Sequence, residues 1–278
     1  MQLLPAVRAE LILFRRDDAT GREARGKCQI DKSLQWKRQC LHQALVGHKF
    51  ARHKRSMQTA HPPEIFDRRR RRARQERGAD RTHVSAFLWY LLADDIADRL
   101  SCTTRSFKSC LIIGPLAHRA RELMAGKTDS ITLLPIADED RLDQTLAGFD
   151  LIIAAGVLDS VNDLPGALIQ IRRALQPDGL FLGAMFGSGT LVQLKKALLI
   201  ADDQRSSAHI HPQIELRSAA DLLSRAGFAM PVADKAGYDV RYASWRMAVS
   251  DLRDAGLGNC LNQQPPFLGK SYPARLDA

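Results

Sequence analysis

Residues 149–186 read FDLIIAAGVLDSVNDLPGALIQIRRALQPDGLFLGAMF, and this stretch decides the class of fold. Its first part, Phe149–Ala155, is a continuous apolar run of the kind found in strands buried on both faces. Its last part, Leu180–Phe186, is a second such run. A strand, a helix and a strand joined by short links predict a right-handed parallel crossover, the repeating unit of a doubly wound α/β sheet.

The segment between the two runs carries the signals of a helix start and a helix end. Asn162 and Asp163 have side chains that cap helices, and Pro165 follows in the first turn, where no backbone N–H is needed. Leucine and isoleucine then recur at helical spacing, with arginines on the opposite side. Pro177-Asp178-Gly179 is expected to stop the helix and turn the chain.

The rest of the chain is expected to continue this alternation. The expected strands cover 109–114, 130–136, 228–232 and 238–242, the last two on either side of a turn at 235–237. The expected helices cover 118–125, the segment after 187–190, 218–226 and 244–256. Ser218 opens a variant of the capping box, and Gly227 is the glycine that ends the same helix.

The net charge of +10 is concentrated at the head of the chain. Residues 1–81 hold 21 Lys and Arg against 9 Asp and Glu, whereas residues 82–278 hold 20 against 22. Residues 1–56 show no sustained period, so we expect either a disordered basic tail or a start wrongly placed before Met57, and we favour the second. The expected organisation is then a helical segment at 57–108, an α/β domain at 109–258 and a flexible tail at 259–278.

A dense arginine run, Arg68–Arg72 with Arg74 and Arg77, lies just after Met57. It could contact phosphate or an acidic partner protein, or it could be the solvated start of a helix that continues through His83 to Leu100. We favour the helix. Aromatic residues do not interleave with the arginines as base stacking requires, so nucleic acid is not expected as a partner.

The sequence favours neither a disulfide framework nor a metal site nor a membrane span. The five cysteines lack CxxC spacing, which fits a reducing compartment, and the His209-x-His211 pair has no third ligand at useful spacing. The longest apolar run, Leu151–Leu158, is far shorter than the roughly 20 residues that span a bilayer. We expect a bacterial cytoplasmic protein that reaches the inner membrane only through its partners.

Three segments carry a family resemblance: VNDLPGALIQIRRALQPDG, HPQIELRSAADLLSRAGFAMPVAD and VRYASWRMAVSDLRDAGLGN. They resemble class I S-adenosylmethionine-dependent methyltransferases, and within them the branch of respiratory complex I assembly factors. The neighbouring branch contains the malonyl-carrier-protein methyltransferases of biotin synthesis. The segment IFDRRRRRAR, after Met57, is similar to the start of the assembly-factor branch.

The resemblance implies a Rossmann-like, mostly parallel sheet with an antiparallel C-terminal strand, here with room for one βα unit fewer. It implies S-adenosylmethionine as cofactor, although the family's D-x-G-x-G-x-G loop is reduced to LIIGPLAH, so binding could be weak or absent. The implied cofactor-binding residues are Ile113, Gly114, Asp138, Glu139, Ala155, Gly156 and Val157. The implied substrate-binding residues are Asp159, Asn162 and Arg217, and no catalytic residue can be named.

Two functions follow from the resemblance. The first is a methyltransferase with a degenerate cofactor loop. The alternative is a complex I assembly factor on the same fold, acting as a protein arginine hydroxylase or as a binding protein without chemistry. The partner would be a respiratory complex I subunit or another protein substrate.

Overall fold

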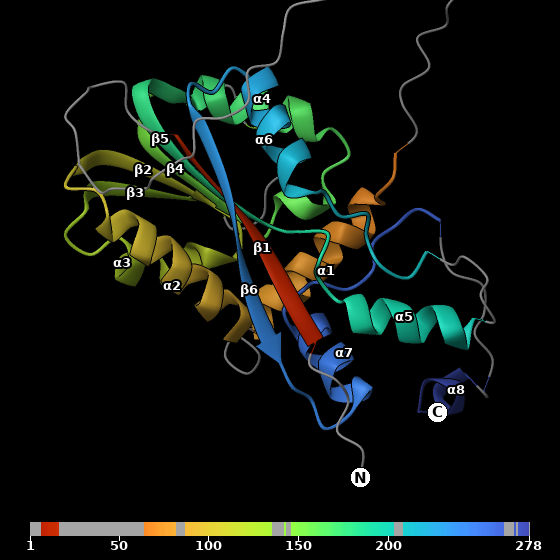
Figure 1. The fold of residues 1–278 in the computed structure, drawn as a ribbon. Coiled ribbons are helices and arrows are strands. Elements are labelled where there is room, and N and C mark those ends of the chain that lie inside the picture. The colour runs from red at the N-terminus through yellow and green to blue at the C-terminus, as the bar shows by residue number, and fades with distance from the viewer. Residues whose placement is uncertain are drawn as a thin grey trace, which may run out of the picture. The chain divides into compact units, whose positions relative to one another are not determined.

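A six-stranded sheet in the order β3-β2-β4-β5-β1-β6 organises the part of the chain that the structure describes (Figure 1). This computed structural model describes residues 7–16, 64–81, 87–134, 142, 146–202, 208–263, 270 and 272–277. The strands are β1 (Val7–Arg16), β2 (Phe107–Ile113), β3 (Thr128–Leu134), β4 (Phe149–Ala155), β5 (Leu175–Phe186) and β6 (Pro231–Val240).

The helices fall along the chain between these strands. They are α1 (Arg68–Arg81), α2 (Phe87–Ser101), α3 (Ala120–Leu123), α4 (Leu164–Ala174), α5 (Val192–Ala201), α6 (Leu216–Arg225), α7 (Trp245–Asp254) and α8 (Tyr272–Asp277), with short 3-10 turns η1 (Pro115–Arg119) and η3 (Leu158–Ser160). The expected cap of α4 is confirmed, since the Asp163 side chain accepts a hydrogen bond from the Gly166 N–H.

Strands β3, β2, β4 and β5 are mutually parallel, which confirms the doubly wound α/β class. The chain leaves β2 to one side to form β3 and returns to the other side to form β4. The order of strands therefore reverses between β2 and β4. In open α/β sheets, ligands bind outside the carboxyl ends of the strands at such a switch point.

Helices cover both faces of the sheet. On one face α2, through Leu92 and Ile96, and α3, through Ala120, pack against β2, β4 and β5. On the other face α4 and α6 pack through Leu168 and Leu223. Every residue of β4 is buried because both faces are covered, as its uninterrupted apolar run predicts.

Strand β1 corrects the expectation that residues 1–56 contain no strand. Its ten residues lie between β5 and β6 and are antiparallel to both. The antiparallel strand of the sheet thus comes from the head of the chain, and β6 runs parallel to β2–β5. A strand held by partners more than 160 residues away leaves little local signal, because its pairing depends on the strand edges that it joins.

The same pairing explains why β6 is one strand rather than two strands with a turn at 235–237. β1 pairs with β6 from Val7 opposite Val240 to Arg16 opposite Pro231, so the chain stays extended through Gly237. The turn expected at Pro177-Asp178-Gly179 is likewise absorbed into β5, as an irregularity with Asp178 at φ 60°.

Helix boundaries also differ from the expected ones. The arginine run and the following apolar stretch form two helices, α1 and α2, and residues 82–86 between them are outside the described residues. Helix α6 begins at Leu216 without a side-chain cap, so the Ser218 capping box is wrong, whereas Gly227 ends it as expected with φ 86°.

Candidate functional site

The switch point is formed by two glycine turns that touch each other. Gly114 follows β2 and Gly156 follows β4, and both have positive φ, 105° and 67°. A Cβ at Gly114 would lie 2.4 Å from the Ala155 carbonyl oxygen. A Cβ at Gly156 would lie 2.4 Å from Cζ3 of Trp89. Glycine is therefore required at both positions for close packing of the protein against itself.

The backbone N–H groups at this point are already engaged. The Gly114 N–H donates to the Leu134 carbonyl at 2.9 Å, and the Gly156 N–H donates to the Ala184 carbonyl at 3.2 Å. Pro115 has no N–H to offer. The space left among Trp89, Pro115, Gly156 and their neighbours is about 50 Å³, whereas drug-sized ligands occupy roughly 300 Å³ or more.

These residues do not fit S-adenosylmethionine. The crevice can take one or two water molecules at about 30 Å³ each, and the N–H groups of Gly114 and Gly156 are already bound to carbonyls of the protein. Five of the sequence-predicted cofactor residues do come together here: Ile113, Gly114, Ala155, Gly156 and Val157. Asp138 and Glu139 lie outside the described residues.

One arginine of the basic run reaches into this crevice. Arg71 is 5% exposed, and its guanidinium donates to the Ser160 hydroxyl at 2.9 Å and to the Val157 carbonyl at 3.0 Å. The interpretation of the run as solvated therefore fails for Arg71, which fastens α1 to the loop after β4. Helical spacing alone does not show which arginine faces inward, because α1 lacks a clear apolar side.

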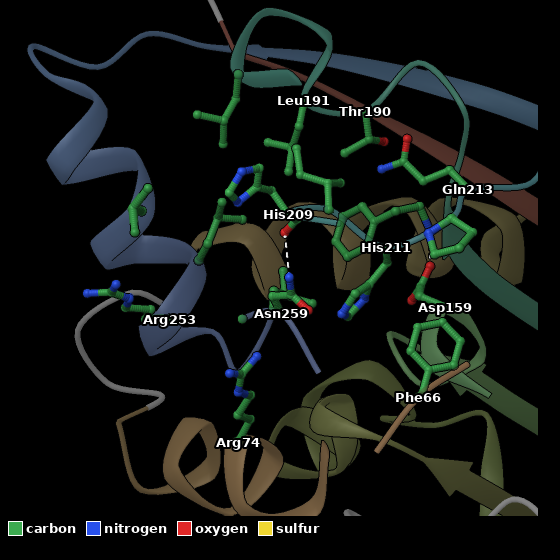
Figure 2. A pocket seen from close by; sticks show the side chains of 18 of the residues that line it. Phe66, Arg74, Asp159, Thr190, Leu191, His209, His211, Gln213, Arg253 and Asn259 are labelled. Carbon is green, nitrogen blue, oxygen red and sulfur yellow. Dashed lines mark hydrogen bonds between the residues drawn. The ribbon is translucent and has the colours of Figure 1, made fainter. Parts of the chain in front are cut away.

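A second and much larger cavity, about 950 Å³, adjoins the crevice. Its walls come from the loop after β4, α5, the 209–214 segment, α7 and α8. Figure 2 shows Arg74 of α1 and Arg253 of α7 on one side of it, with Asp159 and Phe66 on the other. Arg74, Asp159 and His211 line both spaces, so these side chains mark where the crevice and the cavity meet.

Asp159 joins the carboxyl ends of β4 and β5. Its Oδ1 accepts a hydrogen bond from the Phe186 N–H, and its Oδ2 is buried with no hydrogen-bond partner in the described part of the chain. Burial raises the pKa of Asp159 from 3.8 to about 7, against the smaller opposing effects of the Phe186 N–H and of Arg71. The carboxyl is thus poised to gain or lose a proton near neutral pH.

This shift predicts a pH dependence of stability. Because the folded pKa is the higher one, the folded chain holds the proton more tightly, and the free energy of unfolding should fall as pH rises from about 4 to about 7. In Asp159→Asn this fall should shrink. The measurement is urea unfolding at pH 5 and pH 8. Asp163→Asn is the control, since asparagine also caps helices. If stability falls with pH in Asp159→Asn as much as in the wild type, the raised pKa of Asp159 is not its cause.

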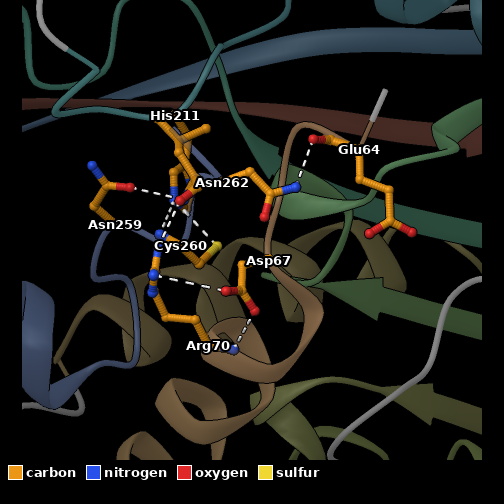
Figure 3. Close-up of polar contacts among 8 residues, drawn as sticks. Glu64, Asp67, Arg70, His211, Asn259, Cys260 and Asn262 are labelled. Carbon is orange, nitrogen blue, oxygen red and sulfur yellow. Dashed lines mark hydrogen bonds and ion pairs between the residues drawn. The ribbon is translucent and has the colours of Figure 1, made fainter. Parts of the chain in front are cut away.

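His211 and Cys260 form a contact that could not be read from the sequence (Figure 3). The Cys260 N–H donates to Nε2 of His211 at 3.0 Å, and the thiol sulfur lies 3.3 Å from the same nitrogen. Burial, followed by Arg74 and Arg71, lowers the pKa of His211 to about 4, and burial raises the pKa of the Cys260 thiol. A neutral imidazole that accepts hydrogen bonds beside a protonated thiol supports a structural role rather than a nucleophile.

The contact belongs to a short ladder that ties residues 65–67 to residues 260–262. Phe66 bridges Leu261, the Asp67 N–H donates to the Cys260 carbonyl at 2.8 Å, and the Asn262 N–H donates to the Ile65 carbonyl at 2.9 Å. The two segments lie almost 200 residues apart, so the sequence gives no sign of their pairing. The expected flexible tail, 259–278, is therefore paired with residues 65–67 at its start, as far as Asn262.

The three predicted substrate residues have separate surroundings. Asp159 and Asn162 line the large cavity, but the Asn162 amide also binds the Phe66 backbone in both directions, at 2.8 Å and 3.0 Å. Arg217 is exposed in the first turn of α6 and does not line either cavity. Asn162 therefore positions the 64–67 segment. Of the three residues, Asp159 lines both the crevice and the large cavity.

The HxH pair does not converge on a metal. His209 contacts Asp202 at 2.7 Å and the Tyr272 hydroxyl at 3.3 Å, whereas His211 contacts Cys260. Within the described residues there is no group of three or more potential metal-ligating side chains. In the same part of the chain, every helix is too short or too polar to cross a bilayer.

The family described as "Methyltransferase domain" matches residues 61–231, more than half of the chain. The chain belongs to this methyltransferase-domain family. The expected resemblance is confirmed, and so is the placement of the family's fold around the 149–186 stretch.

The relatives come from both of the expected branches. "Arginine-hydroxylase NDUFAF5, mitochondrial" of Rattus norvegicus is 34% identical over 221 residues, 70% of this chain and 64% of its own length. The protein of the same name from Danio rerio is 31% identical and covers 74% and 72%. A malonyl-[acyl-carrier protein] O-methyltransferase of Gallionella capsiferriformans is 28% identical over 51% and 49%. The chain thus spans just under two thirds of the rat protein.

Proposed function

We propose that this methyltransferase-domain protein acts by binding a partner protein in the assembly of respiratory complex I, without transferring a methyl group from S-adenosylmethionine. The observation that carries the proposal is the closed crevice at the switch point. The Gly114 turn packs against Ala155, Trp89 covers Gly156, and about 50 Å³ remains. Similarity to arginine-hydroxylases of the assembly-factor branch supports the choice of partner.

Titration with S-adenosylmethionine tests the first half of the proposal. We expect no heat of binding in isothermal titration calorimetry up to about 1 mM ligand, since entry requires displacement of Trp89 and of two engaged backbone N–H groups. S-adenosylhomocysteine, titrated in parallel, should give the same result. Binding of either compound with a dissociation constant below about 100 µM would overturn the proposal that no methyl group is transferred, and would favour an active methyltransferase.

Genetics tests the second half independently of the cofactor. Deletion of the gene should lower the amount of assembled complex I on native gels, and the wild-type chain should restore it. On this proposal the protein works in the cytoplasm and reaches the inner membrane through its partner. Normal assembly in the deletion strain would rule out the complex I role, whatever the titration shows.

A further inference from the structure

The large cavity has the apolar walls of a ligand site. Leucines of α5 and α7 and the Tyr272 ring of α8 line it, including Leu194, Leu198 and Leu252. Its volume of about 950 Å³ lies at the upper end of the roughly 300–1,000 Å³ that small-molecule sites occupy. Apolar walls of this extent favour an aliphatic chain, which packs without leaving polar groups unpaired.

One side of the cavity carries positive charge that the described chain leaves uncompensated. Nη1 of Arg74 is buried and has no hydrogen-bond partner among the residues that the structure describes. Burial, together with the nearby cations Arg70, Arg77 and Arg253, lowers the pKa of Arg74. Neither Arg74 nor Arg253 forms an ion pair with a described carboxylate, and Figure 2 shows both on the same side of the cavity.

The position of Arg74 is set by two packed helices. α1 meets the end of α7 so closely that a Cβ at Gly78 would lie 2.9 Å from the Gly256 Cα. The Arg74 side chain then lies over Gly258, where a Cβ would come within 3.2 Å of Nη1. This packing holds the guanidinium in place, and a fixed guanidinium loses little entropy when it binds an anion.

We propose that the cavity binds an amphipathic carboxylate, with its alkyl chain against the leucines of α5 and α7 and its head on Arg74. Arg74 lines the cavity, and a planar carboxylate matches its guanidinium fork. Asp159 is the lone acidic residue among the described lining residues of the cavity, and no ion pair joins it to Arg74, although both also line the crevice. The proposal stands on the cavity alone and is independent of the partner-binding function.

The test is titration of the full chain with sodium dodecanoate and, in parallel, with dodecanol and dodecyltrimethylammonium. We expect dodecanoate to bind at least about tenfold more tightly than either of the other two, which lack the anionic head. Arg74→Met keeps the bulk of the side chain and removes the charge. This substitution should weaken the binding of dodecanoate by about tenfold or more and leave the affinity for dodecanol unchanged.

Arg72→Met is the matched control, because Arg72 is on the same helix but its side chain is 73% exposed and pairs with Glu76. It should leave all three titrations unchanged, and thermal melting verifies that both variants are folded. Equal binding of dodecanoate and dodecanol to the wild-type chain would overturn the proposal without any variant. No dodecanoate binding up to about 1 mM, or an equal loss in both arginine variants, would overturn it as well.

Discussion

A chain shortened to begin at Met57 is expected to lose its cooperative unfolding transition. The truncation removes β1, which pairs with β5 over five residues and with β6 over ten. β1 is the strand through which β6 joins the sheet. At about 1 kcal/mol for each net hydrogen bond, the loss approaches the whole stability of a domain, about 5–15 kcal/mol. It also exposes two unpaired strand edges.

Thermal melting and size-exclusion chromatography of residues 57–278 beside the full chain measure this effect. Ile12→Pro provides a second variant at full length, since proline inside a strand paired on both sides removes a ladder hydrogen bond and breaks the pairing. Both variants should be aggregated or non-cooperative. If the shortened chain melts as the full chain does, β1 is dispensable, and Met57 is the better first residue of the fold.

Trp89→Ala is expected to lower the free energy of unfolding by about 3–5 kcal/mol, the usual cost of emptying a buried tryptophan site. Trp89 is 5% exposed, and its ring packs over Gly156 at the switch point, where both glycine turns leave little room to collapse. The measurement is the midpoint of urea unfolding at an unchanged slope. The effect tests directly whether Trp89 closes the crevice.

Tyr90→Ala is the matched control for this variant. Tyr90 is the next residue on α2, is also aromatic, and is 41% exposed, with Arg119 stacked over its ring. Its loss should cost no more than about 1 kcal/mol. Similar losses at both positions would mean that Trp89 is not packed into the switch point.

Those parts of the structure that depend on neighbours in the chain are present as the sequence predicts. The apolar run of β4, the Asp163 cap of α4 and the Gly227 end of α6 are local patterns, and each is present as expected. The family resemblance is likewise carried by continuous segments of sequence, so the family could be predicted without the structure. The Ser218 capping box failed because capping depends on the one residue where the helix starts, and α6 starts at Leu216.

The candidate site was only partly predictable. Gly114, Gly156 and Asp159 could be named because the resemblance to the methyltransferase family implies them, and all three follow strands that end near the switch point. The reduced glycine loop already suggested weak cofactor binding. Trp89, Arg71 and Arg74 could not be named, because their roles depend on how α1 and α2 pack over the sheet.

By itself, the sequence determined the doubly wound α/β class, the helices and strands around the 149–186 stretch, and the methyltransferase-domain family. These follow from hydrophobic period, capping and turn residues, which act over a few positions. The tertiary structure alone decided the insertion of β1 between β5 and β6, the closure of the switch point by Trp89, and the meeting of His211 with Cys260. Each of these joins residues that are far apart in the chain, and the free energy of such contacts comes from burial and pairing that exist only once the sheet has formed.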